Sequence, residues 1–198
     1  IVTILVDDLG FADASIRSDT QSFSTCPGTE CVTPNLQALR KEGILLDRHH
    51  TFLWCSPTRR SFLTRRYPVH VTGTQAPTCS NLTPLQFTIL SEKLAAADYE
   101  SHFIGKGHLG YWTTDHLPIN RGFSTAFGYL CGSTGYWNHG NTESLCPGHS
   151  EPFFVLDLTN GTHPALGEYG GRWNGTYETE MYSVALEEIL DNRTNLTQ

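Results

Sequence analysis

The stretch IVTILVDDLG, residues 1–10, decides the fold class of this 198-residue chain. Residues 1–6 are all apolar or β-branched, which is typical of strands buried in a parallel sheet. The run ends in two carboxylates, Asp7 and Asp8, followed by Leu9 and Gly10. We therefore expect a strand over residues 1–6 that carries a polar cluster at its carboxyl end.

Three Ser/Thr-Pro pairs further along the chain predict helix starts, because the hydroxyl can cap the helix and proline suits its first turn. The predicted helices cover residues 34–41, 57–66 and 84–94, and a fourth amphipathic pattern covers residues 177–190. Further strands are expected from residue 44 and over residues 102–105, and residues 131–175 read as a long loop region. Strands alternating with helices indicate an α/β fold with a mostly parallel sheet flanked by helices.

Three polar clusters follow strand-like runs. They are Asp7-Asp8, Cys55-Ser56 and Lys106-Gly107-His108. In open α/β sheets, ligands bind beyond the carboxyl ends of the strands. We therefore expect these clusters on one edge of the sheet.

The adjacent carboxylates Asp7 and Asp8 repel each other unless a cation lies between them. Hard oxygen ligands of this kind suit Ca²⁺ or Mg²⁺. A solvent-exposed turn is the alternative for such a pair taken alone.

Cys55 lies at the expected start of a helix, where free N–H groups and the helix dipole favour an anion. Arg59 follows one turn later and can reach the same anion. A buried structural cysteine is the alternative. A tyrosine-phosphatase loop is excluded by spacing, because the sixth residue after Cys55 is Ser61 instead of arginine. Lys106 and His108 taken alone are more typical of a surface pair than of a catalytic one.

Taken together, these residues resemble a known family. CSPTR (residues 55–59) followed by LTRR (63–66) resembles the sulfatase signature, Cys-x-Pro-Ser/Thr-Arg with a trailing Leu-Thr-Gly-Arg. DDLG (7–10) and GKGHLG (105–110) resemble the two other N-terminal motifs of the family, in the same order, and RGF (121–123) and FGY (127–129) resemble the stretch that follows. The resemblance, which is strongest to arylsulfatase B-like enzymes, implies that residues 1–198 form the N-terminal part of a single alkaline-phosphatase-like catalytic domain, truncated before its C-terminal remainder.

The resemblance implies an enzyme that hydrolyses the sulfate ester of an aryl sulfate or a sulfated sugar. Cys55 would be oxidised to formylglycine by the formylglycine-generating enzyme and would then act as the nucleophile toward sulfur. Arg59 would steady the modified residue, Lys106 would bind sulfate oxygens, and His108 would take a proton as sulfate is released. A transition state that spreads negative charge over oxygens is stabilised by such cations.

The resemblance also implies a divalent cation, Ca²⁺ with Mg²⁺ as the alternative, bound by Asp7, Asp8 and an oxygen of the modified Cys55. The remaining metal ligands of the family come from a later segment. Two other functions stay open: a phosphate or phosphonate ester hydrolase of the phosphatase superfamily, and a non-catalytic sulfatase-like protein.

Two positions depart from the family pattern. Arg65 stands where the family has glycine, and Gly107 stands where it usually has tryptophan. We expect the first to affect recognition by the formylglycine-generating enzyme. We expect the second to loosen the backbone between Lys106 and His108, because glycine adds conformational freedom.

Composition bears on partners and compartment. The net charge is −7, and the excess lies in residues 141–198, which hold nine acidic and two basic residues, so a nucleic-acid partner is not expected. No apolar run is long enough to span a membrane.

Six cysteines and five Asn-x-Ser/Thr sequons favour a disulfide-bonded glycoprotein of the secretory pathway, either lysosomal or extracellular. The sequons are at Asn81, Asn160, Asn174, Asn192 and Asn195.

Overall fold

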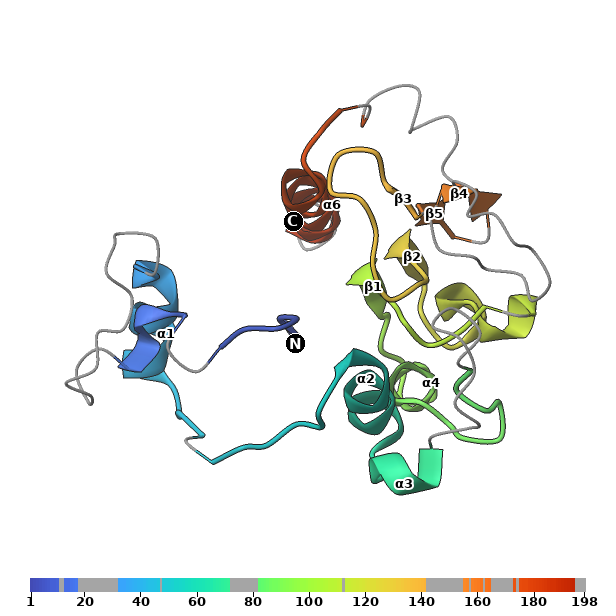
Figure 1. Cartoon of the computed structure of the whole chain (residues 1–198), viewed down its shortest axis with the longest axis horizontal. Coiled ribbons are helices and arrows are strands. Elements are labelled where there is room, and N and C mark those ends of the chain that lie inside the picture. Colours follow the sequence, from blue (N-terminus) through green and yellow to red (C-terminus); the bar gives the residue numbers. More distant parts are fainter. Residues whose placement is uncertain are drawn as a thin grey trace. The chain divides into compact units, whose positions relative to one another are not determined.

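The computed structural model describes residues 1–10, 13–17, 32–46, 48–71, 82–111, 113–141, 155–156, 158–161, 163–164, 173 and 175–194. The chain forms two compact units, Ile1–Thr51 and Phe52–Gln198, and each is described by itself (Figure 1). No helix in the described ranges combines the length and the apolar character needed to cross a bilayer. Cys26, Cys31, Cys79 and Cys146, with the sequons at Asn81, Asn174 and Asn195, lie outside the described residues.

The first unit is organised around one helix, α1 (Pro34–Glu42), and one 3-10 turn, η1 (Ser15–Arg17). The helix predicted over residues 34–41 is thus confirmed. Thr33 does not cap it through a side-chain hydrogen bond. Instead, the Thr33 N–H donates to Ser15 Oγ at 2.8 Å, and the Ser15 N–H donates to Thr33 Oγ1 at 3.2 Å. Gln37 Nε2 adds a bond to the Ser15 carbonyl at 2.8 Å, so α1 and η1 hold each other in place.

The strands predicted for residues 1–6 and from residue 44 are wrong for this structure. Both segments are described and neither forms a strand. Ile1 is 101% exposed and Ile44 is 90% exposed. The physical reason is that a strand exists only through hydrogen bonds to a neighbour. An apolar sequence supplies the side chains for burial but not that neighbour.

The second unit contains a four-stranded sheet in the order β1-β2-β5-β6. β1 (His102–Lys106) and β2 (Thr125–Tyr129) are parallel, while β5 (Thr159–Asn160) and β6 (His163–Pro164) add antiparallel pairs. A separate antiparallel pair joins β3 (Gly140–Asn141) and β4 (Val155–Leu156), within the stretch expected to be a loop. The predicted α/β fold and the strand at residues 102–105 are confirmed, and the described sheet is mixed.

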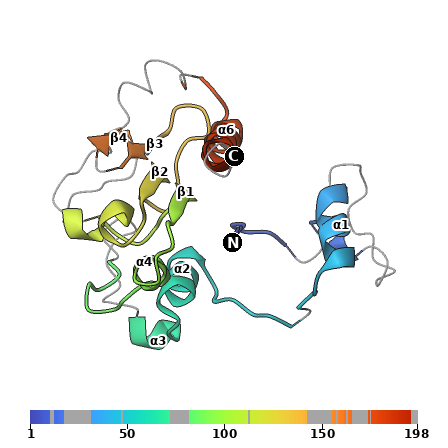
Figure 2. The ribbon, with the colours of Figure 1, turned by 180° about the vertical axis from the view of Figure 1, so that it is seen from behind.

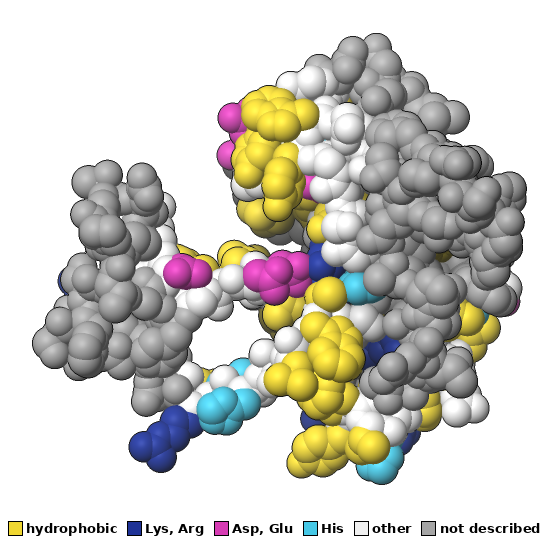
Figure 3. Space-filling model, viewed as in Figure 1, with side chains coloured by type: hydrophobic (Ala, Val, Ile, Leu, Met, Phe, Trp, Pro, Cys, Tyr) yellow, Lys and Arg dark blue, Asp and Glu magenta, His cyan; other side chains and the backbone are white. Residues whose placement is uncertain are grey.

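Helices flank this sheet, as Figures 1 and 2 show from opposite sides. The helices are α2 (Cys55–Thr64), α3 (Pro68–Val71), α4 (Leu90–Ala95) and α6 (Glu178–Thr194), with 3-10 turns η3 (Thr114–His116) and η4 (Pro118–Asn120). α2 and α4 lie side by side in both views. Hydrophobic side chains gather over α6 and over the start of α2 in Figure 3. Leu190 on α6 and Trp54, which precedes α2, are exposed.

The buried core of the sheet lies where α6 packs against β1 and β2. Leu158, Trp173 and Met181 are buried there. The ring of Phe127 on β2 lies 6.0 Å from that of Tyr182 on α6, and 6.2 Å from that of Trp173, measured between ring centroids. This packing fixes α6 on the sheet and leaves the carboxyl end of β1 to the site.

The helix predicted over residues 84–94 begins later, at Leu90, because its proposed start is used otherwise. The Thr83 N–H donates to the Leu109 carbonyl at 2.8 Å, which ties this segment to the chain beyond β1. The Ile89 N–H donates to Glu92 Oε2 at 2.7 Å, so a carboxylate in the first turn caps the helix. The cap that starts α4 is therefore Glu92.

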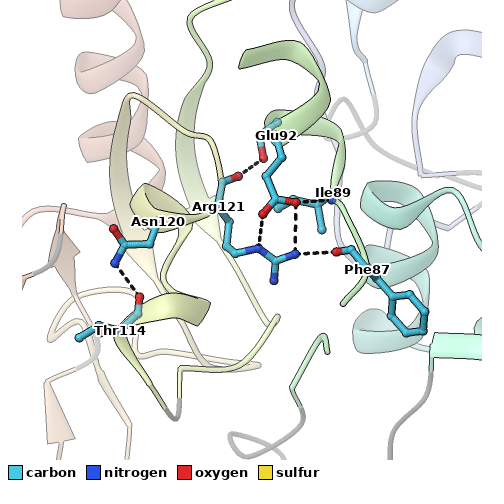
Figure 4. A network of polar contacts seen from close by, with 7 residues as sticks. Phe87, Ile89, Glu92, Thr114, Asn120 and Arg121 are labelled. Atoms are coloured by element: carbon cyan, nitrogen blue, oxygen red, sulfur yellow. Dashed lines mark hydrogen bonds and ion pairs between the residues drawn. The ribbon is translucent and has the colours of Figure 1, made fainter. Parts of the chain in front are cut away.

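Glu92 also holds a buried arginine (Figure 4). Arg121 Nε donates to Glu92 Oε1 at 2.8 Å, and Arg121 Nη2 donates to the Phe87 carbonyl at 2.7 Å. Ser91 Oγ donates to the Arg121 carbonyl at 2.5 Å. The Arg-Gly-Phe stretch at residues 121–123 thereby joins α4 to the chain that leads into β2.

Candidate active site

Cys55 is the first residue of helix α2. Trp54 precedes it in extended conformation, with φ −148°, so the helix begins two residues before the predicted Pro57. Cys55 is half-buried and is a free thiol. The first turn of a helix carries N–H groups without intrahelical partners and the positive end of the dipole. The position suits a group that becomes anionic during a reaction.

The chain entering α2 is held by Thr58, a residue whose role the sequence did not reveal. Its Oγ1 lies 2.9 Å from the Trp54 carbonyl oxygen and 3.2 Å from that of Phe52. The same oxygen accepts the Phe52 N–H at 3.1 Å. A hydroxyl at this position thus fixes the residues on the N-terminal side of Cys55. The signal was present in the family signature, which asks for Ser or Thr here.

Arg59 joins this helix to the end of β1. Its guanidinium is buried, and Nη1 donates to the backbone carbonyl of Lys106 at 2.8 Å. The two residues are 47 positions apart in the chain. Cys55 and Arg59 lie one turn apart on α2, and Lys106 and His108 lie at the carboxyl end of β1. One hydrogen bond therefore brings together the two segments that the sequence singled out.

The backbone beyond Lys106 is tied to the segment after β2. The Gly107 N–H donates to the Tyr129 carbonyl at 2.8 Å, and the His108 N–H donates to the Leu130 carbonyl at 3.1 Å. These bonds continue the β1–β2 pairing past the strand end. These hydrogen bonds on both residues oppose the loosening predicted at Gly107, which stays a prediction.

His108 is buried and its backbone is left-handed, with φ 53°. This conformation is disfavoured for residues with a Cβ and is typical of turns and functional sites. The two hydrogen bonds to residues 129 and 130 keep it in place. The imidazole direction is thus set by a strained turn in the main chain.

Arg65 explains the glycine of the family pattern. It is the C-cap of α2, with φ 58°, and its N–H donates to the Ser61 carbonyl at 2.8 Å. Helices commonly end on a left-handed residue, which is usually glycine because it has no Cβ. Arginine adopts this left-handed conformation here and ends the helix.

The basic cluster around α2 separates into buried and exposed members. Arg65 and Arg66 are exposed, whereas Arg59 and Arg60 are buried. Burial lowers the pKa of Arg60. Arg60 Nη1 lies 3.5 Å from the Val71 carbonyl, and Nε and Nη2 have no hydrogen-bond partner in the described part of the chain.

Asp7 and Asp8 lie in the first unit, after the extended residues 1–6. Both are exposed, and Asp8 has a left-handed backbone with φ 55°. Their donor chemistry fits a hard divalent cation. Among the described residues no group of three His, Cys, Asp or Glu side chains forms a metal cluster. The two carboxylates alone supply fewer oxygens than the roughly six to eight that Ca²⁺ takes.

Comparisons with known proteins agree with the motifs. The family model described as Sulfatase matches residues 1–196. Similar proteins include arylsulfatase J of Mus musculus, 36% identical over 96% of this chain and 29% of its own length, and arylsulfatase G of Rattus norvegicus, 33% identical over 100% of this chain and 34% of its own. The chain spans about a third of the length of these relatives.

The fold is also similar to a solved structure, "Crystal structure of Ps i-CgsB", with a TM-score of 0.66 and 23% identity. That match covers 96% of this chain and 40% of the other. The same protein has been solved in complex with k-i-k-neocarrahexaose.

Proposed function

The chain belongs to the sulfatase family, and we propose that the active protein hydrolyses sulfate esters with groups from α2 and the end of β1. The observation that carries the proposal is the 2.8 Å hydrogen bond from Arg59 to the Lys106 carbonyl. It links the helix that bears Cys55 to the strand end that bears Lys106 and His108. The four residues are then available to one substrate.

Cys55 is the proposed site of formylglycine, which supplies an oxygen nucleophile toward sulfur. Support comes from its sequence context, with Pro57 and Arg59 at the family spacing, and from its place at a helix start. Half-burial allows contact with a substrate while most bulk water is excluded. The formylglycine-generating enzyme is the partner that this proposal requires during maturation.

The neighbouring residues have separate tasks. Arg59, whose Nη1 donates to the Lys106 carbonyl, is proposed to steady the modified residue 55 with its positive charge. Lys106 is proposed to bind sulfate oxygens, where its charge offsets the charge that grows in the transition state. His108, with its backbone held by Leu130, is proposed to accept a proton as inorganic sulfate leaves.

Asp7 and Asp8 are the proposed ligands of a divalent cation, Ca²⁺ or alternatively Mg²⁺, together with an oxygen of the modified Cys55. The cation would neutralise charge on the sulfate group. Two carboxylates and one further oxygen are about half of the six to eight ligands that Ca²⁺ takes. The remaining ligands are proposed to come from outside residues 1–198.

The substrate proposed is an aryl sulfate or a sulfated sugar. Relatives named arylsulfatase support the first. The second follows from the resemblance of the motifs to sulfatases that act on sulfated sugars. We place the protein in the secretory pathway, lysosomal or extracellular, on the basis of its sequons. Two of these, Asn160 and Asn192, are exposed in the structure. Glycosylation and disulfide pairing remain predictions.

The test is turnover of an aryl sulfate and of the matching aryl phosphate by active protein produced with the formylglycine-generating enzyme. Peptide mass spectrometry should show an aldehyde at residue 55. Cys55→Ala should lower sulfate turnover by about a thousandfold or more, because the nucleophile is lost. Lys106→Ala should lower it about a hundredfold, whereas Lys93→Ala, an exposed lysine on α4, should leave it unchanged.

The metal assignment has its own test. Asp8→Ala should abolish both Ca²⁺ binding, measured by calorimetry, and turnover, while Asp115→Ala on η3 should retain both.

Two outcomes of the turnover test would contradict the proposed function. Phosphate turnover above sulfate turnover would favour a phosphatase instead. A wholly thiol Cys55 in active protein would contradict the proposed nucleophile.

A further inference from the structure

The imidazole of His108 lies directly against a glycine, Gly132. A Cβ built on Gly132 would lie 2.7 Å from His108 Cε1, 3.0 Å from Nε2 and 3.2 Å from Nδ1. Real Cβ atoms do not come that close to other heavy atoms. The ring therefore occupies the space that any side chain at position 132 would fill.

Glycine is needed at position 132 for space and not for backbone conformation. Six glycines of the described chain have positive φ, and Gly132 is not among them. Another residue could therefore adopt its backbone without strain. The three heavy atoms nearest to that Cβ all belong to His108, so the requirement comes from the packing of this ring.

The ring has little freedom to move away. His108 is 5% exposed, its φ is 53°, and its N–H is bonded to the Leu130 carbonyl two residues before Gly132. The backbone that presents the ring and the backbone on which it rests thus belong to one hydrogen-bonded pair of segments. Close-packed interiors do not absorb an added methyl group without displacing a neighbour.

We propose that Gly132 is a positioning residue for His108. Because Gly132 has no side chain, the imidazole of His108 can lie where it takes a proton in sulfate ester hydrolysis. This inference rests on the role proposed for His108 above. Residue 132 acts only through the direction of the ring, with no contact of its own to the nucleophile or the sulfate.

The first test is kinetic, with Gly132→Ala in the active protein. The kcat for an aryl sulfate should fall about a hundredfold, since a misplacement of about 1 Å at a reacting group costs about that much. KM should change little, because Lys106 still binds sulfate. The pH dependence of kcat should shift as well, because a displaced imidazole has different neighbours. Simple destabilisation would not move a pH profile recorded well below the unfolding temperature.

The second test is a double-mutant cycle in unfolding, which does not depend on activity. Gly132→Ala should lower the denaturant midpoint in the wild-type background. It should cause little or no loss in the His108→Ala background, because the ring it collides with is gone. Gly135→Ala serves as the matched control, since its Cβ would meet the exposed Asn138 side chain instead. Its effect should be the same in both backgrounds.

The outcomes separate the two proposals. Equal losses from Gly132→Ala in both backgrounds, or an unchanged kcat and pH profile, would overturn the positioning role. Normal turnover by His108→Ala would overturn the proposed function of His108, and the positioning role with it. If Gly132→Ala is too unstable to assay, the double variant Gly132→Ala/His108→Ala can still be unfolded. A denaturant midpoint equal to that of His108→Ala supports the contact between Gly132 and the ring, and a lower midpoint refutes it.

Discussion

Two regions of the second unit each bury an arginine, and they differ in how fully its guanidinium is hydrogen-bonded. Between α4 and η4, Arg121 is 4% exposed and bonded to the Glu92 carboxylate and to the Phe87 carbonyl. On α2, Arg60 is 1% exposed, yet Nε and Nη2 find no partner in the described residues. A buried charge costs several kcal/mol unless it is paired and hydrogen-bonded. Arg121, in the α4–η4 region, meets this condition. Arg60, on the helix that carries the candidate nucleophile, does not.

The difference shows how stability is distributed around the candidate site. The α4–η4 region combines a helix cap, an ion pair and a buried serine hydrogen bond in one network. Helix α2 instead combines a buried guanidinium, whose Nε and Nη2 have no partner among the described residues, with a left-handed arginine at its end. Functional regions commonly keep local features that stability alone would remove. Unfolding experiments can measure how far the two regions differ.

Arg121→Ala should have the largest effect. It leaves the half-buried Glu92 and the Phe87 carbonyl without their donor, so the free energy of unfolding should fall by about 3 kcal/mol. Denaturant unfolding monitored by tryptophan fluorescence is a suitable measurement. Arg66→Ala is the control, because this exposed arginine only lies over the Phe87 ring at 4.9 Å, and its loss should cost about 1 kcal/mol or less. Equal effects would mean that the Glu92 pair contributes little.

Arg60→Leu should act in the opposite direction. Replacing this guanidinium, which makes a single 3.5 Å hydrogen bond to the Val71 carbonyl in the described part of the chain, with an apolar side chain should raise the free energy of unfolding by about 1–2 kcal/mol. Arg60→Met offers a more flexible side chain and should do the same. Arg60→Lys keeps a charge in the buried position and should not stabilise. A loss of stability in both apolar variants would show that Arg60 has a partner outside the described residues.

Arg65→Gly should stabilise α2 by about 1 kcal/mol, because glycine adopts the left-handed C-cap without the steric cost of a Cβ. The same unfolding experiment measures it. Arg65→Ala is the matched variant, since alanine removes the side chain but keeps the Cβ, and it should give little gain. Mass spectrometry of residue 55 in Arg65→Gly would also show whether maturation becomes more complete.

The pH dependence of unfolding should show the smallest effect. Burial alone would raise the pKa of Glu92, but hydrogen bonds from Arg121 and the Ile89 N–H, with the charge of Arg121, lower it below its usual 4.5. A lowered pKa in the folded state gives stability that is fully present above about pH 4.5 and is lost as the pH falls through the folded value. Glu92→Gln should flatten that slope. An unchanged slope would assign the acid sensitivity to other carboxylates.

The candidate site was predictable to the extent that it depends on short motifs. The residues at 55–59 and 105–110 were identified from type and spacing, and the structure joins them through Arg59 and Lys106. Thr58 could have been found from the hydroxyl that the signature requires. Gly132 could not, because its contact with His108 depends on how the segment after β2 folds back along β1.

The sequence by itself determined the helix from Pro34, the strand predicted over residues 102–105, the α/β class and the motif residues. These depend on local signals: proline in a first turn, a short apolar run, and a set of chemical groups at fixed spacing. Tertiary structure decided whether residues 1–6 form a strand, that Glu92 starts α4, that Gly107 is held, and that Gly132 supports His108. Each of these depends on a partner outside the local segment, since a hydrogen bond or a close contact needs two surfaces and a local sequence specifies one.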